Sequence, residues 1–520
     1  MNDFLQLYDR TEFTYWSISV AGVAILLFAA FVSSAKRRHT SSTEATGESF
    51  AQRIWFFLAV AFALLAGRWP YLLFRSYFNP DESQQIAGAI TLVHRPWFWL
   101  AVDGHTAGPM DFYYLCIPAS WRGAINYTSA RAEELLLVLG ILYFCYRIFR
   151  LQLSASTSRK AILPLVFFFA WVTDSDFVEI STEHMPVFLI TAGAYFFFLP
   201  ILTRRDESSQ RKDWLIAGFF LGLAPWAKLQ SAVTAVAGLI VLIGWCISRT
   251  KPFSVGKLLR NVWPFCVGLG LPVLFFGALM LATHQVETFY RSYLAANLDY
   301  TYRGTAKFYL LSELWFFACE SGFFPLLFLG ACAWTTLYWL RIRNRKNHGA
   351  GCVKWFLGYV LISFLTVISP GRPFLHYLLF MVPSLGLLAG YAWAESFSSK
   401  SESLESAWTT IGRQRSGALF VFGWLICFLL ARSLFNVPFA GFLAREWHRP
   451  LSRPAASARR YLKDGDSIAL WGWRPDVYVE LQAPQAVRSA HTQREIEDTP
   501  FRPYYRVRYI ADLEALHPAA

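Results

Sequence analysis

The stretch Asn79-Pro80-Asp81-Glu82-Ser83-Gln84-Gln85 follows the apolar run 54–74, at the point where the chain would leave a membrane. It predicts the start of a helix, because Asn79 is a favoured N-cap, Pro80 suits the first helical position and two acids follow in the first turn. The helix dipole already favours acids there, so they need no further role. Alternatively, an Asp–Glu pair at a membrane surface can deprotonate a hydroxyl group or hold a metal ion. The surroundings of the pair have to decide between these interpretations.

The composition indicates a membrane protein. The chain has 520 residues, of which 55% are hydrophobic and 18% aromatic, and its formal net charge is +13. Repeated apolar runs near the length of about 20 residues that crosses a bilayer predict an all-α polytopic membrane protein. The Lys and Arg residues cluster in short loops between the runs, which is the positive-inside pattern and not a nucleic-acid-binding surface. The eight cysteines show no CxxC spacing, so we expect neither a disulfide framework nor a zinc ribbon.

The apolar runs predict about 12 transmembrane helices. The predicted spans are 16–35, 54–74, 133–150, 161–174, 185–202, 214–227, 229–248, 262–282, 313–340, 353–369, 375–395 and 417–436. The first run has an acidic flank before it and Lys36-Arg37-Arg38 after it, so we expect an uncleaved span with its N-terminus outside. Alternate threading then places six loops inside, and all six carry basic residues. Those inside loops are 36–53, 147–160, 204–213, 249–260, 341–354 and 396–416.

Three regions follow from this threading. Residues 1–53 form an extra N-terminal helix with a cytoplasmic loop, 54–436 form the membrane module, and 75–132 form its first large outer loop. In the region 437–520 the apolar runs shorten to strand length, which predicts a small C-terminal α/β domain on the outer face that leans on the bundle. The predicted strands are 467–473, 477–481 and 505–510. The sequence shows no internal repeat or inverted symmetry of the transporter kind.

Ionisable residues gather at the outer ends of the predicted spans. One short outer loop contains Asp174, Asp176, Glu179, Glu183 and His184. Lys228 lies between two apolar runs, and Arg372 and His376 lie in the outer turn 370–377. A charge at membrane depth is costly and is a functional hypothesis by default. The alternatives are a snorkelling lysine, an ordinary loop cation and a histidine bonded to a neighbouring helix. Together the residues predict an outward cavity with carboxylates at its rim and cations near lipid depth.

This arrangement suits sugar transfer from a polyprenyl phosphate. The lipid phosphate is a tolerable leaving group, and cations in a water-poor site stabilise its growing charge. The attacking hydroxyl group is a weak nucleophile and needs a positioned carboxylate base, for which Asp81 is the candidate. The candidate phosphate-binding residues are Lys228, Arg372, His376 and Arg303. The candidate acceptor- or sugar-binding residues are Asp103, His105, Asp174, Asp176, Glu183 and His184.

The order of these motifs resembles that of a known family. The motifs are Asp81-Glu82 in the first large outer loop, His105 to Tyr114 later in that loop, Lys228 at the end of the run 218–228, and the turn Arg372 to Tyr377. Over roughly residues 54–436 the chain resembles the GT-C glycosyltransferases of the protein O-mannosyltransferase and lipid A aminoarabinose transferase superfamily.

The resemblance implies a polyprenyl-phosphate sugar as donor and an acidic base in the first outer loop. It assigns the base to Asp81, a role as assistant or metal ligand to Glu82, and donor binding to Lys228. The chain departs from many relatives at His105-Thr106-Ala107-Gly108-Pro109, where they have His-Pro-Pro or Lys-Pro-Pro, so the contacts to the acceptor stay open. No spacing identifies a metal, and the use of a divalent cation is left open.

The sequence therefore predicts an inverting glycosyltransferase of a bacterial inner membrane. Its partners are the lipid bilayer, a polyprenyl-phosphate sugar donor and a glycan, lipid or protein acceptor, and its active site and C-terminus are expected in the periplasm. One alternative is a transporter or flippase of a lipid-linked sugar. Another is a polymerase or ligase that uses a diphosphate-linked oligosaccharide. A third is a non-catalytic assembly subunit in which the acids only start a helix.

Overall fold

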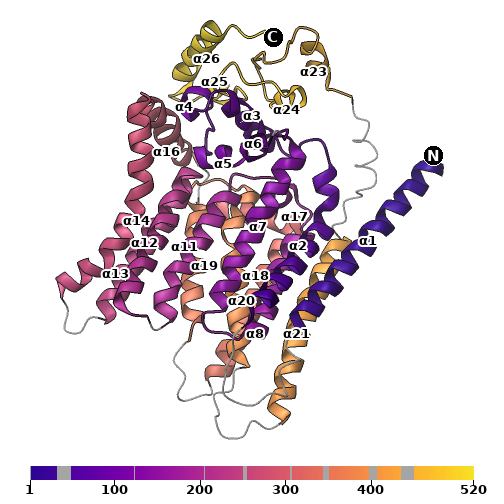
Figure 1. The fold of residues 1–520 in the computed structure, drawn as a ribbon, viewed down its shortest axis with the longest axis vertical. Coiled ribbons are helices and arrows are strands. Elements are labelled where there is room, and N and C mark those ends of the chain that lie inside the picture. The colour runs from indigo at the N-terminus through magenta and orange to yellow at the C-terminus, as the bar shows by residue number, and fades with distance from the viewer. Residues whose placement is uncertain are drawn as a thin grey trace.

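The computed structural model describes residues 2–31, 48–121, 123–203, 205–249, 254–304, 307–343, 351–397, 407–434 and 450–519. Long helices form a bundle, and shorter helices and irregular segments cover one end of it (Figure 1). The described residues contain isolated β-bridges but no β-sheet. The predicted all-α membrane architecture is confirmed. The described segments leave out 32–47, 204, 250–253, 344–350, 398–406 and 435–449, so parts of five predicted inside loops and of the predicted tail domain lie outside them.

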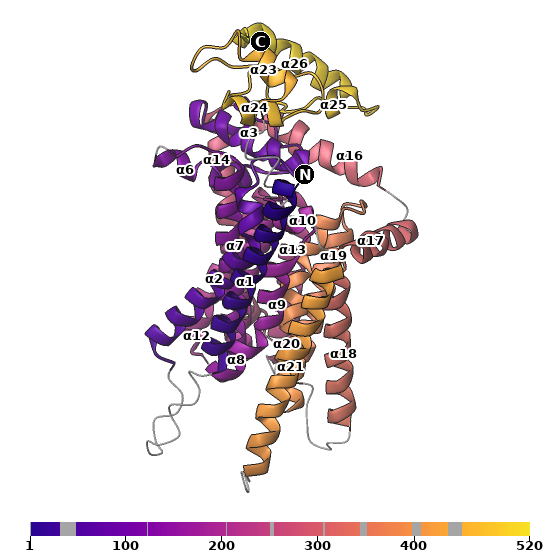
Figure 2. The same cartoon turned by 90° about the vertical axis from the view of Figure 1, so that its right-hand side faces the viewer.

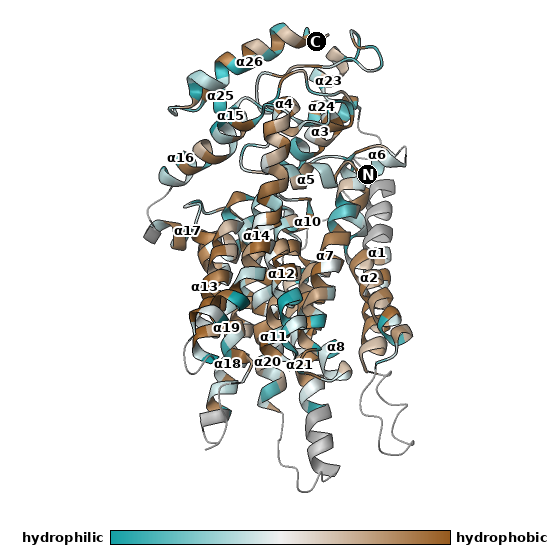
Figure 3. Ribbon diagram, turned by 60° about the vertical axis from the view of Figure 1, so that its left-hand side comes forward, coloured by the Kyte–Doolittle hydropathy of each residue, from teal (hydrophilic) through white to brown (hydrophobic). Residues whose placement is uncertain are grey.

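The bundle consists of long apolar helices. They are α1 (Asn2–Phe31), α2 (Phe50–Leu73), α7 (Tyr127–Phe149), α9 (Leu163–Trp171), α11 (His184–Leu202), α12 (Glu207–Leu223), α13 (Ala232–Arg249), α14 (Val255–Ala282), α17 (Lys307–Ser321), α18 (Phe323–Arg343), α19 (Val353–Ile368), α20 (Val382–Ser396) and α21 (Ala407–Leu434). Among the described residues, eight segments are long and apolar enough to cross a membrane. Apolar residues dominate these helices (Figure 3), as expected for a multi-pass membrane protein.

One end of the bundle, which we call the loop end, carries the short elements. They are α3 (Pro80–His94), α4 (Phe98–Ala101), α5 (Pro109–Tyr114), α6 (Ile117–Ser120), α10 (Ser175–Val178), η2 (Ala224–Trp226), η3 (Leu229–Ser231), α15 (Val286–Phe289), η4 (Tyr290–Ala295), α16 (Ala296–Tyr302) and η5 (Leu375–Phe380). The tail, residues 450–519, lies over them (Figures 1 and 2). The opposite, or far, end carries α8 (Ala155–Ala161).

Helices α12 and α14 pack closely because glycines face each other between them. A Cβ atom at Gly218 would lie 2.2 Å from the carbonyl oxygen of Phe265. A Cβ atom at Gly268 would lie 2.2 Å from the carbonyl oxygen of Leu215. Small residues let helix backbones approach in this way in membranes. Both helices run toward the loop end, where α12 leads directly into the segment that carries Lys228.

The prediction of one continuous span at 313–340 is wrong. The chain breaks at Gly322, whose φ of +67° is left-handed and ends α17. Helix α18 then starts at Phe323 and runs in a different direction (Figure 2). The apolar run continues across the break, so hydrophobicity alone did not reveal it.

The predicted strands of the tail are also wrong. Residues 477–481 belong to α24 (Asp476–Leu481), and residues 505–510 belong to α26 (Arg502–Leu516). Residues 467–473 are irregular and form one bridge, from Ile468 to Gln485. Apolar runs of five to seven residues fit a strand or a short buried helix equally well. The tail also contains α23 (Arg453–Ala458) and α25 (Gln493–Ile496), and α24 packs on α3, where Ala87 joins the apolar cluster of the tail.

Candidate functional site

A cavity of about 300 Å³ lies at the loop end of the bundle, beneath the tail. Its walls come from α3, the segment 104–107, the loop before α11, the junction of η2 and η3, α16, η5 and the tail. The lining residues are Asn79, Pro80, Asp81, Gln84, Gln85, Gly104, His105, Thr106, Ala107, Asp176, Thr182, Lys228, Tyr300, Phe374, His376, Tyr377, Trp473, His491, Gln493 and Arg494. Five of the residues singled out from the sequence therefore meet in one cavity, although they come from distant parts of the chain.

Asp81 lies at the start of α3, as the sequence predicts. The Asn79 side chain caps the helix by accepting a hydrogen bond from the Asp81 backbone N–H at 3.1 Å, and Pro80 occupies the first turn. The Asp81 side chain is partly accessible and lines the cavity. Across the described residues, no hydrogen bond or ion pair reaches its carboxylate. The Asp81 carboxylate is therefore free to accept a proton from a bound hydroxyl group.

The surroundings of Asp81 change its acidity in both directions. Burial raises the pKa of Asp81 because it penalises the charged form. The positive charges of His376 and Lys228 lower this pKa, and the negative charges of Glu183 and Asp176 raise it. The net shift is upward, which makes Asp81 a stronger base than an exposed aspartate.

Glu82, the neighbour of Asp81, points away from the cavity into a buried ion pair. Its two carboxylate oxygens lie 2.7 and 2.6 Å from the guanidinium nitrogens of Arg131. Arg131 also donates hydrogen bonds to the backbone carbonyls of Tyr71, Phe74 and Ser76 at 2.6–2.8 Å. Glu82 thus joins the start of α3 to Arg131 of α7, which in turn holds the end of α2, and Glu82 lies outside the lining of the cavity.

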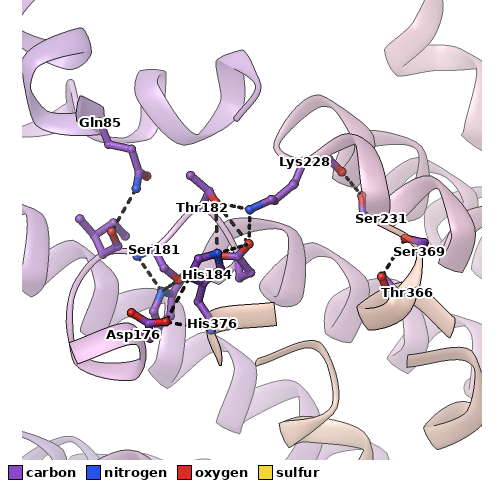
Figure 4. Close-up of polar contacts among 12 residues, drawn as sticks. Gln85, Asp176, Ser181, Thr182, His184, Lys228, Ser231, Thr366, Ser369 and His376 are labelled. Atoms are coloured by element: carbon purple, nitrogen blue, oxygen red, sulfur yellow. Dashed lines mark hydrogen bonds and ion pairs between the residues drawn. The ribbon is translucent and has the colours of Figure 1, made fainter. Parts of the chain in front are cut away.

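Lys228 reaches the cavity floor from the junction of η2 and η3 (Figure 4). Its Nζ donates a hydrogen bond to Thr182 Oγ1 at 2.5 Å and forms an ion pair with Glu183. The side chains of Lys228 and Glu183 are 4% and 0% exposed. The ammonium group also lies 4.8 Å from the ring centroid of Tyr377. A backbone bridge between Lys228 and Ala107 fixes this segment against the outer loop.

His376 and Asp176 form the second polar group of the cavity (Figure 4). The Nδ1 atom of His376 lies 3.3 Å from Asp176 Oδ2, and the His376 backbone N–H donates to the same oxygen at 3.2 Å. The Nε2 atom lies 3.9 Å from a Glu183 oxygen, so His376 links the two carboxylates. Asp174 caps α10 by accepting from the Asp176 backbone N–H at 3.0 Å, and burial raises its pKa to about 6.

His184 belongs to a separate buried cluster outside the cavity lining. Its Nε2 atom lies 2.9 Å from Glu134 Oε1, and its Nδ1 atom lies 3.0 Å from Ser181 Oγ. Glu134 also accepts hydrogen bonds from Arg68 at 2.8 and 2.9 Å. These contacts join α2, α7 and α11, so the cluster holds the helices together next to the site.

Asp103 and the two predicted loop arginines also lie outside the lining. Asp103 pairs with Arg508 of the tail at 2.5 Å and accepts the backbone N–H of His105 at 2.9 Å, so it positions the segment that carries His105. Arg372 lies over the ring of Tyr300, a lining residue, at 4.5 Å. Arg303 pairs with Asp299 and donates to a tail carbonyl at 2.9 Å, at the exposed rim. Of the four candidate phosphate-binding residues, Lys228 and His376 line the cavity.

The tail contributes lining residues that the sequence did not single out. The ring of Trp473 stacks on His491 with a centroid distance of 4.7 Å and an angle of 4°. His491 also lies against His105 at 4.7 Å, and its Nε2 atom lies 3.2 Å from Gln84 Oε1. Arg494 also lines the cavity, and its guanidinium carbon lies 5.6 Å from the ring centroid of Tyr300. His491 and Arg494 could have been noticed as ionisable residues, but no spacing relates them to the outer loop.

Several buried polar atoms of the cavity walls have no hydrogen-bond partner among the described residues. They are Gln84 Nε2, Gln85 Oε1, His105 Nε2 and His491 Nδ1. Burial and the neighbouring His491 hold the pKa of His105 well below its usual value, and burial with Arg494 lowers the pKa of His491 to about 4. Both imidazoles are therefore neutral at pH 7, and the walls offer neutral donors and acceptors beside an aromatic ring. Such a surface suits a ligand rich in hydroxyl groups.

The described residues contain no group of three or more His, Cys, Asp and Glu side chains arranged to hold a metal ion. Glu183 is paired with Lys228, and Asp176 lies against His376. The carboxylates of the site are thus paired mainly with cationic side chains.

Comparisons with known proteins agree on the architecture. Residues 106–280 match the family model described as dolichyl-phosphate-mannose-protein mannosyltransferase. The chain is similar to ArnT from Cupriavidus metallidurans bound to undecaprenyl phosphate, with 14% identity and a TM-score of 0.55 over 84% of this chain and 86% of that chain. The apo state of ArnT gives 16% identity and a TM-score of 0.53 over 84% and 85%. No curated protein sequence matches the chain. The likeness to ArnT shows the GT-C fold, which confirms the fold expected from the sequence.

Proposed function

We propose that this GT-C-fold membrane protein transfers a sugar from a polyprenyl-phosphate donor to a hydroxyl acceptor. The observation that carries the proposal is the Asp81 carboxylate, which has no partner among the described residues and lines a cavity together with Lys228 and His376. A base and two cationic side chains in one partly closed site are what this reaction requires.

In the proposed reaction, the donor phosphate lies against Lys228 and His376. Asp81 takes the proton of the acceptor hydroxyl group as its oxygen attacks the anomeric carbon. The bond between that carbon and the phosphate oxygen breaks, and its electron pair leaves with the lipid phosphate. Lys228 and His376 stabilise the charge that develops there. A single displacement of this kind inverts the configuration at the anomeric carbon.

The neutral wall beneath the tail supports a sugar as the transferred group. Gln84, Gln85, His105 and His491 offer buried polar atoms to hydroxyl groups, and the ring of Trp473 offers an apolar face. A sugar that cannot make these hydrogen bonds leaves buried polar atoms of the wall unpaired, so the site would discriminate strongly against it. We therefore propose that the tail takes part in selecting the sugar.

The comparisons support the donor class. The description of the matching family names a dolichyl-phosphate sugar, and the structure of ArnT holds undecaprenyl phosphate. Both lipids are polyprenyl phosphates. The fold similarity and the cationic side chains of the cavity are consistent with such a donor here, whereas the acceptor, which we place among glycans, lipids and proteins, has no comparable support.

The orientation in the membrane is part of the proposal. Basic residues lie at the far end of the bundle, including Arg159 and Lys160 on α8, Arg205 before α12 and Arg249 at the end of α13. By the positive-inside rule the far end faces the cytoplasm. The cavity and the tail then face the periplasm of a bacterial cell, where the donor sugar would be presented.

Purified protein in lipid, incubated with a panel of polyprenyl-phosphate sugars and a membrane extract as acceptor source, tests the proposal. We expect release of free polyprenyl phosphate, at least about 100-fold slower in Asp81→Asn, because a positioned base contributes about 10²–10⁴-fold. The control is Asp213→Asn, which removes a carboxylate at the far end, and it should release at the wild-type rate. The anomeric configuration of the product, read by NMR, tests inversion.

Other outcomes of this experiment identify the alternatives. A transporter or flippase would move the donor across a vesicle without breaking the sugar–phosphate bond. A polymerase or ligase would act only on diphosphate-linked oligosaccharides. Equal release from wild type and Asp81→Asn would contradict the role of Asp81 but keep the reaction. A non-catalytic assembly subunit would release nothing and would tolerate Asp81→Asn in cells.

A further inference from the structure

A second and larger cavity lies between helices of the bundle, away from the candidate site. Its volume of about 630 Å³ falls within the range of about 300–1,000 Å³ that ligand pockets occupy. Its walls come from α11, α13 and α19, and Leu221 of α12 also lines it. Thr234, Gly238, Val241 and Trp245 follow along α13 at steps of three or four residues, so one face of that helix lines the cavity.

The walls of this bundle cavity are apolar and roomy. Phe197 on α11 and Trp355 on α19 supply large apolar surfaces, while Ala194, Gly238 and Gly358 leave space between them. A Cβ atom at Gly358 would meet no other atom within 4 Å. Thr234 lies near the loop end of α13 and Arg249 at its far end, so the lined face is about 22 Å long at 1.5 Å per residue.

The far end of the bundle cavity is positively charged. Arg249 and Lys354 lie at this mouth, and both are exposed. Arg249 rests over the ring of Trp245 at 5.0 Å, and Lys354 lies 5.9 Å from the ring of Trp355. Within the described ranges, neither cation forms an ion pair with a carboxylate. The aromatic and cationic pairs match the composition of side chains at a membrane–water interface.

The other end of the bundle cavity is closed, since the hydroxyl groups of Thr234 and Thr366 join α13 and α19 by a hydrogen bond of 2.8 Å. The cavity therefore has a cationic mouth at the far end and an apolar interior leading away from it.

We propose that the bundle cavity binds an acyl chain of an anionic glycerophospholipid from the leaflet at the far end, with the lipid phosphate held by Arg249 and Lys354. The apolar face of about 22 Å exceeds the roughly 15 Å depth of one leaflet, so a chain can be accommodated along it. Negatively charged headgroups are attracted to such basic clusters. A polyprenyl-phosphate donor would place its phosphate at Lys228, at the opposite end, so the charge of the mouth favours the phospholipid. The choice of the phospholipid over the donor rests on the proposed function, whereas the binding of a lipid chain in the cavity does not.

Native mass spectrometry of the purified full-length chain tests the proposal. The probes are phosphatidylglycerol and phosphatidylcholine with identical acyl chains, added to delipidated protein in detergent. We expect one tightly held phosphatidylglycerol and at least a tenfold preference over phosphatidylcholine. The double variant Arg249→Ala/Lys354→Ala should lose that preference. Its matched control, Lys257→Ala/Arg260→Ala, removes two exposed cations from the far end of α14 and should keep it.

A second pair of variants tests the interior of the bundle cavity. Gly358→Leu places a side chain in the open space and should prevent binding, while Gly277→Leu on α14, which also has open space around its Cβ position, should bind normally. Phosphatidylglycerol should raise the Tm of wild type and of Gly277→Leu but not of Gly358→Leu, and Tm without lipid shows that each variant is folded.

Two results would overturn the proposal. Equal phosphatidylglycerol binding by all variants would mean that the lipid sits only around the bundle. Displacement of phosphatidylglycerol by polyprenyl phosphate, with the same loss in Gly358→Leu and no loss in Arg249→Ala/Lys354→Ala, would assign the bundle cavity to the donor chain.

Discussion

Lys228 and Glu183 are a buried ion pair in which only one member has a place in the proposed chemistry. Their side chains are 4% and 0% exposed, so each neutralises a charge that the protein interior would otherwise penalise. Thr182 accepts a further hydrogen bond from Lys228. A substitution of Lys228 would therefore remove the proposed phosphate ligand and leave Glu183 uncompensated at the same time, and the two effects have to be separated.

A double substitution makes this separation. We expect Lys228→Gln to lower the free energy of unfolding by about 3–5 kcal/mol, the usual loss when a buried pair is broken, and to lower kcat/KM for the donor. Lys228→Gln/Glu183→Gln should recover most of the Tm, because no buried charge is left alone, but not the activity. Tm and donor kinetics measured on the same preparations check this. Recovery of both quantities would restrict Lys228 to a structural role.

The acidity of Asp81 predicts the pH dependence of the reaction. A base works only when ionised, and burial raises the pKa of Asp81 above the ordinary value of about 3.9. The value of kcat/KM should therefore fall as the pH decreases, with an acid limb at a higher pH than an exposed aspartate would give. Asp174 is a second candidate for this limb, since its pKa is raised to about 6. Asp174→Asn retains a residue type that caps helices well, so the fall of kcat/KM at low pH should remain in this variant. Its disappearance in Asp174→Asn would contradict the assignment of the acid limb to Asp81.

The sequence predicted the residues of the site unevenly. Asp81, Lys228 and His376 stood out because charge beside apolar runs is rare and costly. Tyr300 and Trp473 did not, since 18% of the chain is aromatic and the lining rings have no distinguishing pattern. The different roles of Glu82 and Asp81 could not be predicted either, because the two acids are adjacent in the same helix start. The partner of Glu82, Arg131, lies 49 residues away, and only the fold brings the two together.

At the scale of elements, the lengths of the apolar runs predicted the helices of the bundle well and the elements of the tail poorly. The long runs that became α11, α13 and α14 were predicted to within a few residues, apart from an early start to α14. Runs of five to seven residues, such as 477–481, carry no periodicity that separates strand from helix. The end of α17 at Gly322 could likewise not be predicted, because many helices tolerate one glycine in an apolar run.

The crossing of α12 and α14 gives a prediction about elements. Gly268→Ala places a methyl group 2.2 Å from the Leu215 carbonyl oxygen, so the helices must move apart. We expect the free energy of unfolding to fall by about 1–3 kcal/mol, as for overpacked cores, with a lower Tm. Gly277→Ala on the same helix meets nothing within 4 Å and should be neutral. Equal Tm values for the two variants would show that the contact relaxes without cost.

At the scale of the whole molecule, the tail is held on the loop end by hydrogen bonds, by the packing of α24 on α3 and by a buried ion pair. Asp103 and Arg508 pair at 2.5 Å with side-chain exposures of 3% and 4%, and the Asp103 backbone N–H donates to the Arg488 carbonyl at 2.8 Å. Arg508 also reaches Ser292 of η4 at 2.9 Å. One guanidinium thus joins the outer loop, η4 and the tail.

Breaking this junction should release the tail while the bundle stays folded. We expect Arg508→Met to increase the rate of proteolytic cleavage within residues 450–519 at least tenfold and to lower activity, because Trp473, His491 and Arg494 leave the cavity wall. Arg488→Met breaks a pair with Asp512 that lies within the tail, and it should leave the protease pattern of the junction close to wild type. Limited proteolysis followed by mass spectrometry distinguishes the two variants. Unchanged cleavage in Arg508→Met would contradict the role of the junction.

The tail forms one wall of the cavity and is synthesised after the bundle, which has a consequence for biogenesis. Trp473, His491 and Arg494 follow α21 in the chain, so the ribosome makes them after the bundle helices have entered the membrane. Until the tail folds back onto α3, the cavity lacks one wall. Catalytic competence would therefore be acquired after insertion, and a nascent chain that stalls before the tail would be an integrated but inactive protein.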